Sequence, residues 1–144
     1  MLDTRRIVDM LGGPGVLGRE IERTSEAIEL VRDGLPTRVL DVIMARLDLS
    51  RDEVSAVAGI PLRTLARRQR EERLKPEESN RIYRLAQVTA FAEDVFGDLD
   101  KAHHWLRKPN RALGGQVPLD LLDTDLGTAE VRNVLGRIAH GVHS

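Results

Sequence analysis

The stretch that decides the fold runs from Leu49 to Arg73 and reads LSRDEVSAVAGIPLRTLARRQREER. Ser50 is a favourable N-cap for a helix over 51–58. Gly59 permits a sharp turn, and Pro61 suits the first turn of a second helix. Two short helices joined in this way predict a helix-turn-helix. Apolar side chains hold the pair together, namely Val54, Ala58, Ile60 and Leu65.

The second of these helices is strongly basic. Residues 62–75 contain six basic and two acidic residues, whereas the whole chain has a net charge of −1. At 100° per residue, Arg63, Arg67 and Arg70 fall within about 60° of one another and opposite Leu65. A recognition helix in the major groove needs this division between a packed side and a side of guanidinium groups. The predicted DNA contacts are Arg63, Thr64, Arg67, Arg68 and Arg70.

Two alternatives stay open for these arginines. The basic helix could be a solvated surface whose arginines pair with the glutamates at 71, 72, 77 and 78. Arg68 points nearer the packed side than its neighbours, so it either pairs internally or touches a phosphate.

Composition excludes several classes of protein. The 144 residues allow one compact domain or two small ones that share a helix. The absence of cysteine excludes disulfide scaffolds, thiol nucleophiles and thiolate metal sites. No apolar run approaches the roughly 20 residues of a membrane span, and the first residues lack the apolar core of a signal peptide. We therefore expect a soluble, cytoplasmic protein without a membrane partner.

Hydrophobic periodicity predicts an all-α fold. Apolar residues recur every three to four positions over 37–47, 77–96 and 131–142, and Gly141 is well placed to end the last helix. The four aromatic residues all lie between positions 83 and 105. This asymmetry predicts an N-terminal module over residues 1–89 and a C-terminal module over residues 90–144, joined by the long helix.

Other candidate sites fail on inspection. The segment 13–18 reads GPGVLG and matches GxGxxG, but the residues before it look helical rather than strand-like, which favours a flexible connection over a dinucleotide site. His103 and His104 face different directions on a helix, and His140 with His143 lacks a third ligand. With no catalytic constellation in view, we expect no metal, no cofactor and no enzymatic activity.

The C-terminal sequence contains many turn-forming residues. Beyond Phe96 it reads GDLDKAHHWLRKPNRALGGQVPLDLLDTDLGTAEVRNVLGRIAHGVHS. This stretch resembles the toxin-binding domain of Xre-type antitoxins from bacterial RES–Xre toxin–antitoxin pairs. The resemblance rests on Trp105-Leu106, Pro109-Asn110, Ala112-Leu113-Gly114-Gly115, Pro118, Leu121-Leu122-Asp123-Thr124 and Leu135-Gly136-Arg137-Ile138.

The basic segment also resembles the Xre-like part of that family. The matching residues there are Gly59-Ile60-Pro61, Thr64-Leu65-Ala66-Arg67-Arg68 and Leu74-Lys75-Pro76-Glu77-Glu78-Ser79. The chain departs from the family pattern at Ser55, where alanine is frequent, and at Arg68, where an apolar residue is frequent. The resemblance covers about positions 34–144.

The resemblance implies an all-helical, non-catalytic antitoxin. Such a protein represses its own promoter and neutralises a RES toxin, which is similar to ADP-ribosyltransferases and attacks NAD, either by degrading it or by transferring its ADP-ribose to a target. In that family the antitoxin's C-terminal end reaches the NAD pocket of the toxin. The residues assigned to toxin binding on this basis are Trp105, Arg137, His140, Gly141, Val142, His143 and Ser144.

A homodimer is expected, because one short helix contacts too few base pairs for a specific promoter and a pair of them matches a palindrome. The alternative function is a stand-alone transcription regulator whose C-terminal module dimerises or senses a small ligand.

Overall fold

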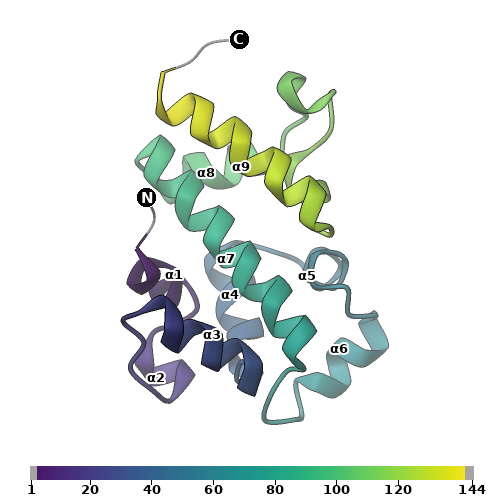
Figure 1. The fold of residues 1–144 in the computed structure, drawn as a ribbon. Coiled ribbons are helices and arrows are strands. Elements are labelled where there is room, and N and C mark those ends of the chain that lie inside the picture. Colours follow the sequence, from purple (N-terminus) through teal and green to yellow (C-terminus); the bar gives the residue numbers. More distant parts are fainter. Residues whose placement is uncertain (1–2, 142–144) are drawn as a thin grey trace. The chain divides into compact units, whose positions relative to one another are not determined.

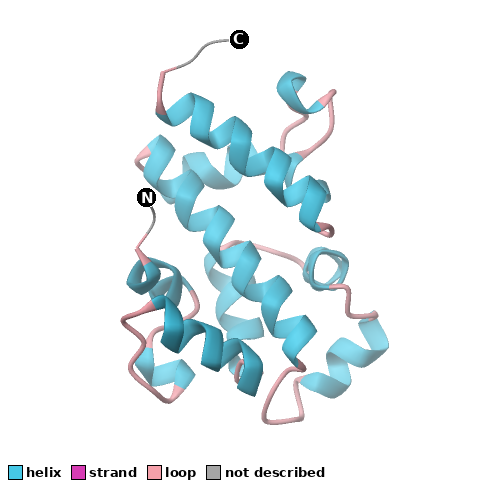
Figure 2. Ribbon diagram, in the orientation of Figure 1, coloured by secondary structure: helices cyan, strands magenta, loops and turns pink. Residues whose placement is uncertain are grey.

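The computed structural model describes residues 3–141, and over that range it contains helices and loops but no strand (Figures 1 and 2). The chain divides into two compact units, Met1–Gln87 and Val88–Ser144. The division falls inside α7 (Pro76–Phe96), a helix that spans 21 residues. The all-α prediction is confirmed.

The first unit is a set of short helices followed by the beginning of α7. The elements are α1 (Thr4–Met10), α2 (Pro14–Leu17), α3 (Thr24–Asp33), α4 (Arg38–Arg46), α5 (Arg51–Ala58) and α6 (Leu62–Arg68). The helix predicted over 37–47 is therefore α4. The core of the first unit is aliphatic, and the fully buried side chains include Leu11, Leu30, Leu40, Ile43 and Leu65.

The GPGVLG segment proves to be part of this helical unit. It follows α1 rather than a strand, and its Pro14–Leu17 portion forms the single turn α2. The expected flexible connection is wrong, because Pro14 at the first helical position and left-handed Gly18 at its end favour a helical turn. The rejection of a dinucleotide motif agrees with this geometry, since the motif needs a preceding strand.

Two loops of the first unit are tied to each other. The hydroxyl of Thr37 donates to the carbonyl of Glu71 at 2.6 Å, and its amide donates to the carbonyl of Glu72 at 3.0 Å. The amide of Leu74 donates to the carbonyl of Leu35 at 2.8 Å. These bonds join the α3–α4 loop to the α6–α7 loop, and they limit how far α6 can continue.

The second unit is built around the last helix. Its elements after α7 are α8 (Leu99–Leu106), the 3₁₀ turns η1 (Arg111–Leu113) and η2 (Pro118–Leu121), and α9 (Asp125–Ala139). Both 3₁₀ turns contact α9. Ala102, Leu122, Val131 and Leu135 are fully or almost fully buried. Gly141 has φ +68° two residues beyond α9, as expected for a glycine that ends a helix.

Within the described range 3–141, no helix combines the length and the apolar character required to cross a membrane.

Candidate functional site: an arginine-bearing helix and an aromatic groove

Helices α5 and α6 form the predicted helix-turn-helix. Ser50 caps α5 by accepting a hydrogen bond from the amide of Glu53 at 3.1 Å, and the Glu53 carboxylate accepts from the Ser50 amide at 2.9 Å. Gly59 ends the helix with φ +66° in the left-handed region. The predicted cap and turn are both confirmed.

Ser55 stabilises the turn between the two helices. Its hydroxyl donates to the carbonyl of Ile60 at 2.5 Å, while its own carbonyl accepts from the Ile60 amide at 3.0 Å. A frequent alanine at this position would leave the Ile60 carbonyl without that bond. The departure from the family pattern therefore adds a side-chain contact and does not disturb the turn.

The two sides of α6 differ as predicted. Leu65 is fully buried against the unit, whereas Arg63 and Arg67 are exposed. Arg67 lies 3.8 Å from the carboxylate of Glu71, an exposed pair that stabilises little and leaves the guanidinium accessible. No ion pair involves Arg63 among residues 3–141. Thr64 is half-buried on the same helix.

Two members of the predicted arginine set behave differently. Arg68 is 4% exposed and its Nε donates to a carboxylate oxygen of Glu78 at 2.9 Å. It also contacts Glu71 at 3.1 Å, so the internal alternative holds and Arg68 is removed from the exposed DNA-contact set. The hydrogen bond that Arg68 donates to Glu78 raises the pKa of Arg68, although burial opposes that shift.

Arg70 is exposed but lies beyond the end of α6. The prediction that it shares one helical face with Arg63 and Arg67 is wrong, because α6 ends at Arg68 and the chain then turns towards the bonds with Thr37 described above.

Sequence reasoning missed Leu62. It lies three positions before buried Leu65, and its exposed fraction is 46%. It stands at the first position of α6 beside Arg63. The exposed start of the helix therefore combines one aliphatic and one cationic side chain, and no signal in this sequence alone distinguishes that placement.

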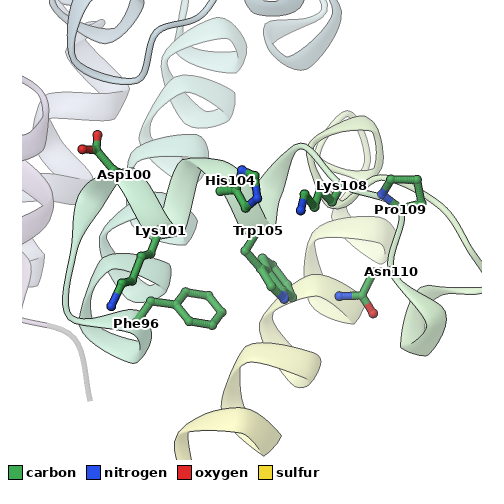
Figure 3. Close-up of a pocket in the computed structure, with 8 residues that line it drawn as sticks. All are labelled: Phe96, Asp100, Lys101, His104, Trp105, Lys108, Pro109 and Asn110. Atoms are coloured by element: carbon green, nitrogen blue, oxygen red, sulfur yellow. The ribbon is translucent and has the colours of Figure 1, made fainter.

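Trp105 lies in an open groove of the second unit, with a volume of about 580 Å³. Its ring centroid is 5.7 Å from that of Phe96, with the planes inclined by 41°. Figure 3 shows Trp105 between Phe96 and Asn110, with Lys101 on the Phe96 side and Lys108 on the Asn110 side. Asp100, His104 and Pro109 complete the lining.

The remaining toxin-contact candidates lie at the other end of the second unit's sequence. Arg137 is exposed in the last turn of α9, His140 caps that helix, and Gly141 follows it. Val142, His143 and Ser144 lie outside the described residues. No hydrogen bond or ion pair joins Trp105 to Arg137 or His140 within the described range. Nor do residues 3–141 contain a cluster of three side chains that could hold a metal ion.

Two family models match the chain. Residues 26–87, which include α5 and α6, match the antitoxin Xre-like helix-turn-helix domain. Residues 91–141, which include the whole groove around Trp105, match the antitoxin Xre/MbcA/ParS C-terminal toxin-binding domain.

Curated relatives that match the chain are named as antitoxins, and two of them match most of it. An "Antitoxin Xre" from Photorhabdus laumondii is 37% identical over 80% of this chain and 79% of the relative. An "Antitoxin Xre" from Yersinia enterocolitica is 36% identical over 89% of this chain and 88% of the relative. A "Prs ADP-ribosylating antitoxin" from a Sphingobium species is 39% identical over 47% of this chain and 48% of the relative. The chain, with its helix-turn-helix and its toxin-binding domain, belongs to the Xre family of antitoxins.

Proposed function

We propose that this antitoxin neutralises a RES-domain toxin by blocking its active site and represses its own promoter as a homodimer. We assign DNA binding to residues 1–89 and toxin binding to residues 90–144. The protein acts by binding in the cytoplasm, without catalysis and without a cofactor. The DNA-binding part of this proposal is supported above all by helix α6, in which Leu65 is buried on one side and Arg63 and Arg67 are exposed on the other.

DNA recognition uses the exposed side of α6 in the major groove. Arg63 is the best candidate for a bidentate contact with guanine, because it lies near the start of the helix and its guanidinium has no ion-pair partner among residues 3–141. Arg67 and Arg70 supply phosphate contacts that position the helix. A homodimer places two such helices on the two halves of a palindrome.

The RES assignment rests on the resemblance of the C-terminal stretch. The name of the Sphingobium relative refers to ADP-ribosylation, which is consistent with this assignment. In this proposal Arg137 and His140 flank the base of a C-terminal tail formed by Gly141, Val142, His143 and Ser144. A pocket built for an anionic dinucleotide contains cationic groups, and the carbonyl and hydroxyl oxygens of residues 141–144 can accept hydrogen bonds from them. The tail therefore plugs the pocket, while the groove around Trp105 anchors the complex.

Co-expression with the product of the neighbouring toxin gene tests this function. The full chain should protect growth and keep cellular NAD constant, whereas a variant lacking residues 141–144 should allow NAD loss and still co-purify with the toxin. Equal protection by the shortened chain would overturn the plug. A neighbouring toxin that, in the absence of antitoxin, neither lowers cellular NAD nor attaches ADP-ribose to a protein would overturn the RES assignment.

The promoter half has its own test. The purified antitoxin should retard a fragment of its own promoter in a gel, and it should sediment as a dimer without DNA at tens of micromolar. Failure to retard that fragment, alone and with toxin, would contradict autorepression. A protein that binds the promoter but no toxin would instead match a stand-alone regulator.

A further inference from the structure

The groove beside Trp105 combines an aromatic floor with hydrogen-bond donors at its edges. All eight lining residues come from one stretch, positions 96–110, at the end of α7, along α8 and in the turn that follows. The accessible lining is mostly apolar. The groove therefore belongs wholly to the second unit.

The groove lies on the side of α8 opposite the residues that pack into the core of the second unit. Ala102 and Leu106 are 0% and 4% exposed and face the interior of the second unit. Lys101 and Trp105 are four residues apart on α8, so they project from the helix within about 40° of each other, and Lys108 follows two residues beyond the end of the helix. The groove therefore lies on the side of α8 that faces away from the core of the second unit.

The chain places scarce residue types here. It has four aromatic residues in all, and two of them, Phe96 and Trp105, form the half-buried floor of the groove. It has three lysines, and Lys101 and Lys108 stand at the groove's edges. Aromatic residues surrounded by a polar rim are the usual composition of the part of a protein interface that contributes most binding energy.

Donors outnumber acceptors around the floor. Neither lysine has an ion-pair partner among residues 3–141, and the indole N–H of Trp105 has no acceptor in that range. The side-chain oxygen of Asn110 already accepts a hydrogen bond from the amide of Ala112 at 2.9 Å. The NH₂ group of Asn110 can therefore donate to a bound partner. Asp100 is the single carboxylate of the lining. The groove therefore fits a segment that is apolar at its centre and rich in oxygen acceptors on both sides.

We propose that this groove is the docking site for an acidic segment of the cognate toxin, which packs one aliphatic or aromatic side chain against the accessible side of the Phe96–Trp105 pair and places carboxylates against Lys101 and Lys108. The inference rests on the proposed toxin-binding function and names the surface that performs it. Continuity supports the toxin as occupant, because the groove lies entirely within residues 91–141, the range matched by the toxin-binding family model. Docking here anchors the complex independently of the C-terminal tail.

The test measures the affinity of the full-length antitoxin for a catalytically inactive form of the toxin encoded beside it. Trp105→Ala should weaken binding by about 30-fold or more, as expected for a central aromatic contact, and Trp105→Phe should recover part of the loss. The pair Lys101→Glu and Lys108→Glu should weaken binding by about tenfold or more and should reduce its dependence on salt.

Lys75→Glu is the matched control. It makes the same substitution at an exposed lysine of the first unit, outside residues 91–141, and it should leave the affinity within about twofold. Circular dichroism shows whether Trp105→Ala still folds. If Trp105→Ala does not fold, the variants at the exposed lysines still test whether the toxin binds in the groove. The chain's single indole N–H also gives one NMR resonance, which should shift when toxin binds.

Each result has a definite meaning. If the unchanged antitoxin fails to bind the toxin, the proposed function itself is wrong. If it binds, and the groove variants bind equally well without an indole shift, the docking site lies elsewhere and this inference is overturned. If the groove variants lose self-association but keep the toxin, the occupant is a second copy of the chain, which also overturns the inference.

Discussion

The guanidinium of Arg68, at the end of α6, donates to the carboxylate of Glu78, near the start of α7, at 2.9 Å, and the two side chains are 5% and 10% exposed. The same Glu78 oxygen accepts the amide of Lys75 at 2.9 Å. Arg68 also contacts Glu71 in the intervening loop. One buried ion pair thus fixes the end of the candidate recognition helix to the long helix.

Arg68→Ala should destabilise the protein by about 3 kcal/mol, because it leaves the buried carboxylate of Glu78 without its cation. Urea unfolding followed by circular dichroism measures this loss. Arg63→Ala, which removes an exposed arginine of the same helix, should change the free energy of unfolding by no more than about 0.5 kcal/mol. Equal stability of the two variants would contradict a structural role for the Arg68–Glu78 pair.

Gly127→Ala should unfold or strongly destabilise the second unit, by about 2 kcal/mol or more. A Cβ at this position would collide with the carbonyl oxygen of Leu121, a backbone atom that cannot move independently of η2. Gly136, in the same helix α9, has no heavy atom within 4 Å of an added Cβ. Gly136→Ala should therefore be neutral or stabilising by up to about 1 kcal/mol. Thermal unfolding of both variants checks this contrast. Equal melting temperatures for the two variants would mean that the first turn of α9 is not tightly packed against Leu121.

Arg67→Ala should weaken promoter binding and lower the slope of log affinity against log salt by about one unit, as expected for the loss of one phosphate contact. Arg63→Ala should cost about 1–3 kcal/mol on the promoter and relax base preference at one position. Fluorescence anisotropy over a salt series measures both effects. Arg132→Ala, at an exposed position of α9, is the control and should leave the slope unchanged. An unchanged slope for Arg67→Ala would mean that the exposed side of α6 does not face the phosphates.

Leu62→Ala should reduce affinity for a promoter site that contains thymine beside the base read by Arg63. The exposed aliphatic side chain is suited to contact the thymine methyl group in the major groove. Replacing each thymine of the site in turn with uracil removes only that methyl. One replacement should weaken the unchanged protein about threefold to tenfold and have no effect on Leu62→Ala. Equal losses for both proteins at every position would refute the contact.

Glu26→Gln should make stability less dependent on pH in the acid range. The Glu26 carboxylate accepts hydrogen bonds from the amides of Glu22 and Arg23 at 3.1 and 3.0 Å, and these bonds lower its pKa from the usual 4.5. Because the folded-state pKa is below the unfolded value, the stabilisation is present above that value and is lost as pH falls through the folded pKa. Urea midpoints from about pH 7 to pH 3 measure it. The control Glu20→Gln, at an exposed position nearby, should follow the unchanged protein.

The sequence by itself determined the features that depend on neighbouring residues. Ser50 and Gly59 set the limits of α5 through a local capping bond and a left-handed backbone, and periodicity placed α4 and α7 to within one residue of their expected starts. The family resemblance was likewise readable from the turn-rich stretch around Trp105. Local geometry carries all of this information, so no tertiary contact was needed to predict it.

Only the tertiary structure decided which of those residues are available to a partner. The helical spacing predicts Arg70 on one helix with Arg63 and Arg67, but α6 ends before Arg70. Leu62, at the first position of that helix, is 46% exposed. The bonds from Thr37 to the carbonyls of Glu71 and Glu72, more than thirty positions away, draw the chain out of the helix. Burial of a side chain depends on what packs against it, and the helix end depends on a distant loop. Neither is encoded in the spacing of the residues along α6.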